Sequence, residues 1–132
     1  MRFVDANVFI YVLIQSPRKD YEISDRILKR VENGEKVVTS LPVIQEVIKW
    51  LEYNNRKKEV ASFLLAINSY ISMNKITTEW HNFIPSIEDM NKKQIGFIDS
   101  LTLQIMKEYK ITEIYSNDKD FDRIDCVKRI WE

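Results

Sequence analysis

The sequence predicts a single α/β domain of three layers, in which helices cover both faces of a mostly parallel sheet. Its 132 residues suit one domain, and 45% of them are apolar, which is enough for a sizeable core. Short apolar or β-branched runs alternate with longer segments whose apolar residues recur at helical spacing. No repeat, low-complexity segment or Gly/Pro-rich linker divides the chain, so we expect one domain over residues 1–132. Such alternation is typical of a parallel sheet covered on both faces.

Each expected element has its own signal. The strands are short runs rich in β-branched or apolar residues, and the helices carry apolar residues three and four positions apart. In order, we expect a strand at 3–4, helices at 8–14 and 20–31, a strand at 36–39, helices at 42–51 and 60–71, a strand at 75–78, helices at 80–90 and 97–109, and strands at 114–116 and 127–131. The connections between parallel strands should be right-handed.

Several residues mark the helix boundaries. Asn33-Gly34 should end the helix at 20–31, because glycine readily takes the left-handed conformation of a C-terminal cap. Ser40 is a plausible N-cap for the next helix, and Pro42 falls in its first turn, where the missing N–H costs little. Pro85 is expected to interrupt the helix at 80–90.

The composition excludes several kinds of active site. A single cysteine, Cys126, and a single histidine, His81, leave no disulfide, cysteine zinc cage, His-assisted triad or His-rich metal site. With 20 basic and 20 acidic residues, the chain is not a strongly basic nucleic-acid-binding protein. Any chemistry must therefore run on carboxylates, amides, hydroxyls, Lys and Arg. We expect Cys126 to be a small buried hydrophobic residue.

No targeting or membrane segment is expected. The N-terminus lacks a basic region followed by a long apolar run and a cleavage site, and no stretch approaches the ~20 apolar residues that span a bilayer. We therefore expect a cytoplasmic protein that does not bind membranes.

Four acidic residues stand where strands end or helices begin. Asp5 follows the first strand, and Asp118 follows the strand at 114–116. Glu46 lies early in the helix after the second strand, and Asp99 lies just inside a strongly apolar helix. In a parallel sheet these ends share one edge, where ligands bind in open α/β folds. We therefore expect the four carboxylates to converge.

Converging carboxylates favour a metal site. Like charges raise one another's pKa, and a hard divalent cation such as Mg²⁺ or Mn²⁺, which prefers oxygen ligands, relieves that repulsion. A bound cation can polarise water and neutralise a phosphate, so this set favours metal-dependent hydrolysis of phosphodiesters. Each acid also has a plain structural interpretation: a turn former at Asp5, a solvated helix residue at Glu46, and helix caps at Asp99 and Asp118. The joint placement of the four favours function.

Four segments carry the pattern of a known family. In order they are FVDANVFIY, TSLPVIQEVIKWL, GFIDSLTLQI and IYSNDKDFDRI. Together they resemble a PIN domain, the family named after the N-terminal domain of PilT, and within it a small toxin of the VapC type. The resemblance covers essentially the whole chain. It implies a PIN-like α/β/α fold with four or five strands and a Mg²⁺- or Mn²⁺-dependent endoribonuclease.

The resemblance also implies roles for individual residues. The catalytic, metal-binding acids would be Asp5, Glu46, Asp99 and Asp118. Asn7 matches the polar residue after the first Asp, and Ser116 matches a Ser or Thr that orients the acidic centre. Asp122 matches a further acid and would join Glu46 at a second metal or the attacking water, whereas Asp120 is more simply a loop acid.

The substrate would be RNA, and the partners would be other proteins. We expect Lys119, Arg123 and Lys49 to contact phosphates that flank the scissile one. The resemblance further implies a homodimer and a small cognate antitoxin of the VapB type. The apolar faces at 23–31 and 60–71 exceed what a thin sheet needs, so part of this surface should form the dimer or receive an antitoxin helix.

Other functions are weighed against this one. A phospho-acceptor receiver domain needs paired acids after its first strand, but Asp5 stands alone. A DxDxT phosphatase needs Asp and Thr where this chain has Asn7 and Phe9. The large flap-endonuclease relatives carry insertions that this sequence lacks. A housekeeping PIN nuclease of RNA maturation or decay stays open as an alternative, and a non-catalytic nucleic-acid or protein binding module also remains.

Overall fold

Five parallel strands form the central sheet of the computed structural model, which describes residues 1–132. The strands are β1 (Arg2–Val4), β2 (Val37–Ser40), β3 (Met73–Ile76), β4 (Glu113–Tyr115) and β5 (Lys128–Ile130). Their order across the sheet is β3-β2-β1-β4-β5, and every neighbouring pair is parallel. The chain builds outward from β1 on one side and then returns to build the other, which puts the topological switch point beside β1. Ligands of open α/β sheets bind outside the carboxyl ends of the strands at such a point.

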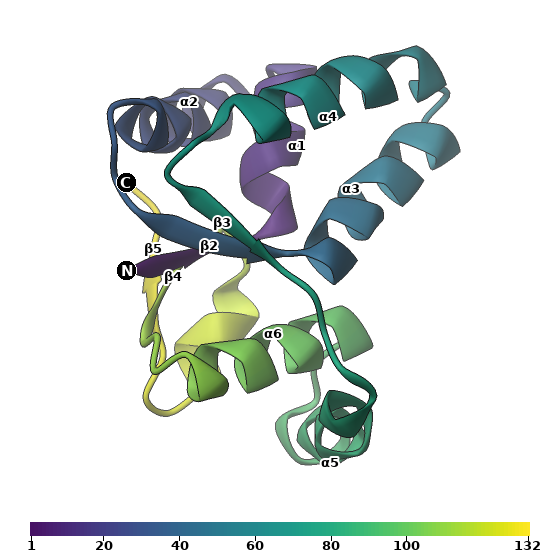
Figure 1. The fold of residues 1–132 in the computed structure, drawn as a ribbon, viewed down its shortest axis with the longest axis vertical. Helices are drawn as coiled ribbons and strands as arrows, with labels where there is room; N and C mark the ends of the chain where they lie inside the picture. The colour runs from purple at the N-terminus through teal and green to yellow at the C-terminus, as the bar shows by residue number, and fades with distance from the viewer.

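Helices cover both faces of this sheet, as predicted (Figure 1). They are α1 (Ala6–Ile14), α2 (Arg18–Glu32), α3 (Leu41–Tyr53), α4 (Val60–Ser69), α5 (Phe83–Lys93) and α6 (Phe97–Glu108), with short 3-10 helices η1 (Lys57–Glu59), η2 (Trp80–Asn82) and η3 (Lys119–Arg123). In Figure 1, α1, α2 and α4 lie on one side of the sheet and α5 and α6 on the other, while α3 extends from the end of β2. Within these layers α1 packs on α2 and α3, and α5 packs on α6. No helix combines the length and the apolar character needed to cross a lipid bilayer.

The sheet residues are buried in runs rather than in alternation. Phe3 and Val4 of β1 are completely buried, as are Ile114 and Tyr115 of β4. This pattern is expected where both faces of a parallel sheet are covered. The core is therefore continuous through the sheet, and polar side chains that chemistry requires can reach solvent only beyond the strand ends.

The helix boundaries follow the local signals. Ser40 caps α3, because its hydroxyl oxygen accepts the N–H of Val43 at 3.2 Å, and Pro42 is the second residue of that helix. Gly34, which follows the end of α2, has a φ of 107°, a conformation that favours glycine. These three predictions are confirmed.

Other local predictions were wrong. The third strand was expected near the right place, but it runs from Met73 to Ile76, so both of its bounds lie two residues before those of the expected segment 75–78. Pro85 does not interrupt a helix, because it is the third residue of α5, where its missing N–H would have no intrahelical partner. Cys126 is exposed rather than buried, since the chain turns there with a φ of 66°.

The two apolar helix faces differ from each other. The apolar face of α2 is used by the core, because Ile23, Ile27, Leu28 and Val31 are all buried. The surplus expected there was therefore wrong. On α4, by contrast, Leu64 and Leu65 are exposed, and Ile71, which was expected on the helix, lies beyond its end and is fully exposed.

Candidate functional site

The pairing of β1 with β4 brings together two residues that are far apart in the sequence. Val4 lies opposite Tyr115, and the N–H of Asp5 donates to the carbonyl oxygen of Tyr115 at 3.1 Å. The next residues, Asp5 and Ser116, therefore leave neighbouring strands side by side. The hydroxyl of Ser116 donates to Oδ2 of Asp5 at 2.7 Å. Strand register thus fixes the centre of the site.

Asp5 is a buried carboxylate held by several donors. Its side chain caps α1, with Oδ1 accepting the N–H of Ala6 at 2.8 Å, while Oδ2 accepts from Ser116 and, at 3.3 Å, from Nδ2 of Asn7. The residue is only 4% exposed. Burial raises the pKa of Asp5 and the charge of Asp118 adds to this, while the three hydrogen bonds oppose it; the net pKa is raised.

A hydrogen-bond network ties the loop after β4 to the start of α1. Asn7 donates from Nδ2 to Oγ of Ser116 at 3.1 Å and accepts at Oδ1 from the N–H of Asn117 at 3.0 Å. Ser116 also accepts the N–H of Asp118 at 3.0 Å. The Ser116 hydroxyl therefore uses its one hydrogen and both lone pairs, so it holds Asp5 and Asp118 in fixed relation.

All four predicted acids line a single small cleft at the carboxyl edge of the sheet. The cleft has a volume of about 180 Å³ and is lined by Asp5, Ala6, Asn7, Ile10, Glu46, Trp50, Asp99 and Asp118. Helix α3, which follows β2, supplies Glu46, and the first turn of α6 supplies Asp99. The expected convergence of the four residues on one place is thus present in the fold.

Burial and mutual repulsion together raise the pKa values of acids in this cleft. Burial, followed by the charges of Asp5, Asp118, Glu46 and Asp120, raises the pKa of Asp99 to about 8. Partial burial and the charges of Asp5 and Asp118 raise the pKa of Glu46 to about 7. Water still reaches Glu46, which is an exposed residue, and screens part of its repulsion. Near neutral pH the cleft therefore carries protons on at least some of its acids.

The plain structural interpretations hold only in part. Asp99 does not cap α6, because no side chain caps that helix and its N-cap residue is Gly96. Asp118 does cap η3, since its Oδ1 accepts the N–H of Asp120 at 2.9 Å. Its second oxygen makes no such bond. Capping therefore explains one oxygen of Asp118 and nothing about Asp99.

The residues of the cleft have the chemistry to bind a hard divalent cation, but their side chains are not arranged as a complete coordination site. No three acids, histidines or cysteines stand close enough together to form a ready metal cluster. Four carboxylates nevertheless share the cleft. Burial and then the neighbouring negative charges raise the pKa values of Glu46 and Asp99, and a cation would relieve the part that is due to repulsion. With only oxygen donors available, the set suits Mg²⁺ or Mn²⁺ rather than Zn²⁺.

The structure does not bring every predicted residue to the cleft. Asp122 is bound on both oxygens by the guanidinium of Arg129, at 2.9 and 3.1 Å, and this pairing lowers the pKa of Asp122. Arg123 forms an ion pair with Asp120 at 3.1 Å. Neither Asp122 nor Arg123 lines the cleft, because each is engaged by a neighbour of opposite charge.

Two residues that were predicted to bind RNA do not line the cleft, whereas two residues without a predicted role belong to the site. Lys49 and Lys119 are exposed, on α3 and η3, and neither lines the cleft. Trp50 lines the cleft. It stands four positions after Glu46 in α3, so the two side chains lie on the same face of that helix, and this spacing can be read from the sequence. Asn117 was missed as a positioning residue, although it directly follows Ser116 at the end of a predicted strand.

Comparisons with known proteins agree with this architecture. VapC20 of Mycobacterium tuberculosis, described as a toxin that cleaves the sarcin-ricin loop, is 16% identical over 92% of this chain and 93% of its own, with a TM-score of 0.78. VapBC2 of Rickettsia felis, bound to a DNA fragment from its promoter, gives 17% identity, coverage of 99% and 98%, and a TM-score of 0.73. A toxin–antitoxin complex from Klebsiella pneumoniae is 16% identical over 97% of this chain and 96% of its own, with a TM-score of 0.66.

At such low identity, these likenesses establish the fold. No curated protein matches the sequence well enough to count as a relative. The family model of the PIN domain, however, matches residues 2–126, which is nearly the whole chain. The chain therefore belongs to the PIN domain family.

Proposed function

We propose that this protein is a divalent-metal-dependent endoribonuclease and the toxin of a VapBC-type toxin–antitoxin pair. One observation carries the proposal: four carboxylates line a single small cleft at the topological switch point, and the most buried of them, Asp5, is held in place by three donors. Carboxylates without histidine or cysteine are the ligands expected of a magnesium or manganese nuclease.

The residues that would hold Mg²⁺ or Mn²⁺ are Asp5, Glu46, Asp99 and Asp118. When bound, the cation would supply a polarised water and neutralise charge on the phosphate. The chain itself orients the ligands: Ser116 and Asn7 hold Asp5, and the Ser116 hydroxyl also holds the backbone of Asp118. Glu46 and Asp99, whose pKa values are raised, must release protons before they can act as ligands.

Asp122 has no part in this proposed set while Arg129 holds it. Its two hydrogen bonds to the guanidinium occupy both carboxylate oxygens. Glu46, which lines the cleft from α3, is therefore the better candidate to orient an attacking water. This assignment refines the expectation that Glu46 and Asp122 act together.

RNA and two protein partners complete the proposal. The M. tuberculosis neighbour is described as a toxin that cleaves the sarcin-ricin loop, and the other two neighbours are a VapBC protein and a toxin–antitoxin complex, which supports an RNA substrate and an antitoxin partner. We place this activity in the cytoplasm. Trp50 offers an aromatic side chain beside the acids for an unpaired base. Exposed apolar residues on α4 and on the η2–α5 segment, namely Leu64, Leu65, Trp80, Ile84 and Ile87, are suited to an antitoxin or a homodimer contact.

The experiment compares purified wild-type protein with Asp5→Asn on total RNA, with Mn²⁺, Mg²⁺ or EDTA, and maps the new ends. We expect metal-dependent internal cleavage that leaves 5′-phosphates, and none from Asp5→Asn. Asp125→Asn, a change of the same charge at an exposed residue away from the cleft, is the matched control and should cleave normally. Cleavage by folded Asp5→Asn at the wild-type rate would refute the proposal.

The toxin role needs a separate test. Expression of the wild-type chain should arrest growth, and co-expression of a short reading frame found beside its gene should restore it. Growth unaffected by an active ribonuclease would favour the housekeeping role in RNA maturation or decay.

A further inference from the structure

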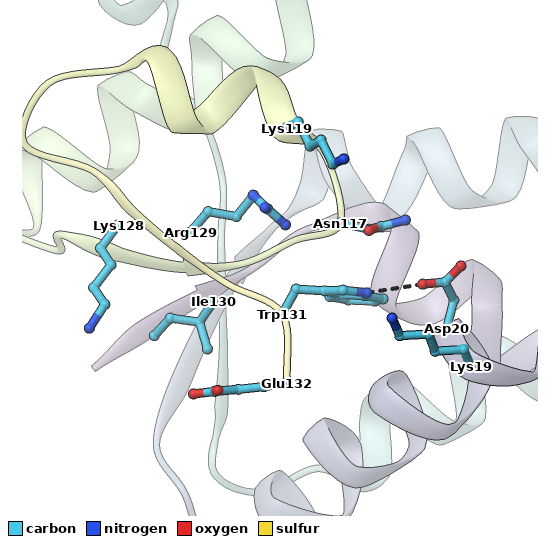
Figure 2. A pocket seen from close by; sticks show the side chains of 9 residues that line it. All are labelled: Lys19, Asp20, Asn117, Lys119, Lys128, Arg129, Ile130, Trp131 and Glu132. Atoms are coloured by element: carbon cyan, nitrogen blue, oxygen red, sulfur yellow. Dashed lines mark hydrogen bonds between the residues drawn. The ribbon is translucent and has the colours of Figure 1, made fainter.

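A second, larger cavity adjoins the acidic cleft. It has a volume of about 830 Å³ and lies between the start of α2, the loop after β4 and the edge strand β5 (Figure 2). Trp131 lies across its middle, with its indole N–H donating to Asp20 at 3.0 Å and its ring 5.7 Å from that of Tyr11. We call this the basic cavity, after Lys19, Lys119 and Lys128, which line it.

The three lysines are free to bind an anion. None of them forms an ion pair, and all three are exposed. The fourth cation of the cavity, Arg129, is already neutralised by Asp122. Of the two acids that line the cavity, Asp20 is engaged by Trp131, which leaves Glu132 as the other. Figure 2 shows Lys119 and Lys19 on the side of the cavity near Asn117, with Lys128 at the far end of β5.

One hydrogen bond separates this cavity from the acidic cleft. Asn117 lines the basic cavity and donates its N–H to Oδ1 of Asn7, which lines the cleft. A second bond, from Nδ2 of Asn117 to the hydroxyl of Tyr11 at 2.8 Å, fixes the Asn117 side chain in this position. A chain molecule that leaves the cleft over Asn117 therefore enters the basic cavity directly.

We propose that the basic cavity binds the backbone phosphates of single-stranded RNA on one side of the scissile bond. The inference rests on the proposed ribonuclease function. The four carboxylates that line the cleft repel a polyanion, so unpaired cations close to the cleft favour its binding. Lys19, Lys119 and Lys128 would each contact a phosphate, and Trp131, held by Asp20 and Tyr11, would form a fixed wall.

Lys128 has a competing explanation. Charged side chains on an edge strand prevent it from pairing with another chain, and Lys128 lies on β5, an edge of the sheet. That role predicts aggregation when Lys128 is removed, with no change in RNA affinity. Phosphate binding predicts the reverse.

The test measures the affinity of the full-length protein for a short single-stranded RNA in EDTA, so that the RNA stays intact, over a series of salt concentrations. The triple variant Lys19→Ala/Lys119→Ala/Lys128→Ala should bind ~10-fold more weakly, and its slope of log affinity against log salt should be lower by about 2, since each phosphate contact on a single strand contributes about 0.7. Lys92→Ala/Lys107→Ala, on exposed positions of α5 and α6, should match the wild type.

The outcomes separate the two proposals. Equal RNA affinity and salt slope in the triple variant and wild type would overturn this inference, whether or not the wild type cleaves RNA. A loss of log affinity in the Lys92→Ala/Lys107→Ala control that is about two-thirds of that in the triple variant, or larger, would overturn it too, because binding would then follow the number of charges removed, two against three. Lysine-dependent binding by a wild-type protein that cleaves no RNA in Mn²⁺ or Mg²⁺ would refute the ribonuclease function and leave the basic cavity as an RNA site.

Discussion

Replacing Asp99 with asparagine should stabilise the metal-free protein. Asn keeps the shape of the side chain, and Asp99 forms no hydrogen bond or ion pair that the change would break. The substitution removes a charge that faces Asp5, Asp118 and Glu46. An ionised Asp99 is therefore unfavourable in the folded state, and its loss should raise the free energy of unfolding.

The magnitude follows from the pKa. Folding raises the pKa of Asp99 from the ordinary 3.8 to about 8, a difference of about four pH units. Each unit corresponds to about 1.4 kcal/mol, which sets an upper limit of about 6 kcal/mol. Because Asp99 is only partly buried and its neighbours titrate with it, we expect about 2–3 kcal/mol, or a rise in Tm of ~7–10 °C for a chain of this size.

The stability advantage of Asp99→Asn should increase with pH. Since the folded state keeps the proton on Asp99 and the unfolded chain releases it above about pH 4, the wild type loses stability as pH rises from about 4 to about 8. The advantage of Asp99→Asn should therefore be near zero at pH 4, grow with pH and level off above pH 8. Below pH 4 both states are protonated and the variant gains nothing.

The assay is urea unfolding at several pH values in EDTA, with Asp125→Asn as the exposed control of the same charge change. Adding Mn²⁺, which the wild type should bind better, favours the wild type. At 100 times the Kd it stabilises the wild type by about 2.7 kcal/mol, which cancels the advantage of the variant, and at 1,000 times the Kd by about 4.1 kcal/mol, which should reverse the order. A destabilised Asp99→Asn, or a difference from wild type that does not change between pH 5 and 8, would show that Asp99 is not under repulsion.

Three further predictions concern the same cleft. Ser116→Ala removes the donor to Asp5 and the acceptor of the Asp118 N–H, so the free energy of unfolding should fall by about 1–3 kcal/mol in urea; equal stability would contradict the network. Binding of Mn²⁺ at pH 7 should release protons from Glu46 and Asp99, so its calorimetric enthalpy should differ between buffers of different ionisation enthalpy; identical enthalpies would contradict the raised pKa values. Asn7→Ala should reduce the rate of RNA cleavage while the protein stays folded, because it removes the hydrogen bonds of Asn7 to Asp5 and Asn117; a wild-type rate in cleavage assays would exclude this positioning role.

Much of the site could be predicted because its determinants are local or topological. Ser40 and Gly34 mark the ends of elements by their own chemistry, so the helices after the strands are placed well. Because strands and helices alternate along the chain, the strands pair in parallel and their carboxyl ends lie at one edge of the sheet. Asp5 and Asp118 then come together without any knowledge of their contacts.

The remainder depends on contacts that no local pattern reveals. Asp118 and Asp122 share one short loop, and sequence spacing cannot say which of them turns into the cleft. Arg129, on the next strand, binds both carboxylate oxygens of Asp122 and so keeps Asp122 out of the cleft. Asn117 likewise gains its role only when the β1–β4 register places it beside Asn7. Cys126 is exposed because of a turn that its own side chain does not signal.

The bond between Asp5 and Ser116 spans 111 positions of the chain. Contacts of such long range slow folding, because the entropy lost on closing a long loop must be overcome before the contact stabilises the chain. A partly unfolded molecule can therefore retain most of its helices and still lack the arrangement of acids in the cleft. Proteolysis or local opening of either β1 or β4 would separate Asp5 from Ser116, so the proposed nuclease site would exist only in the fully assembled fold.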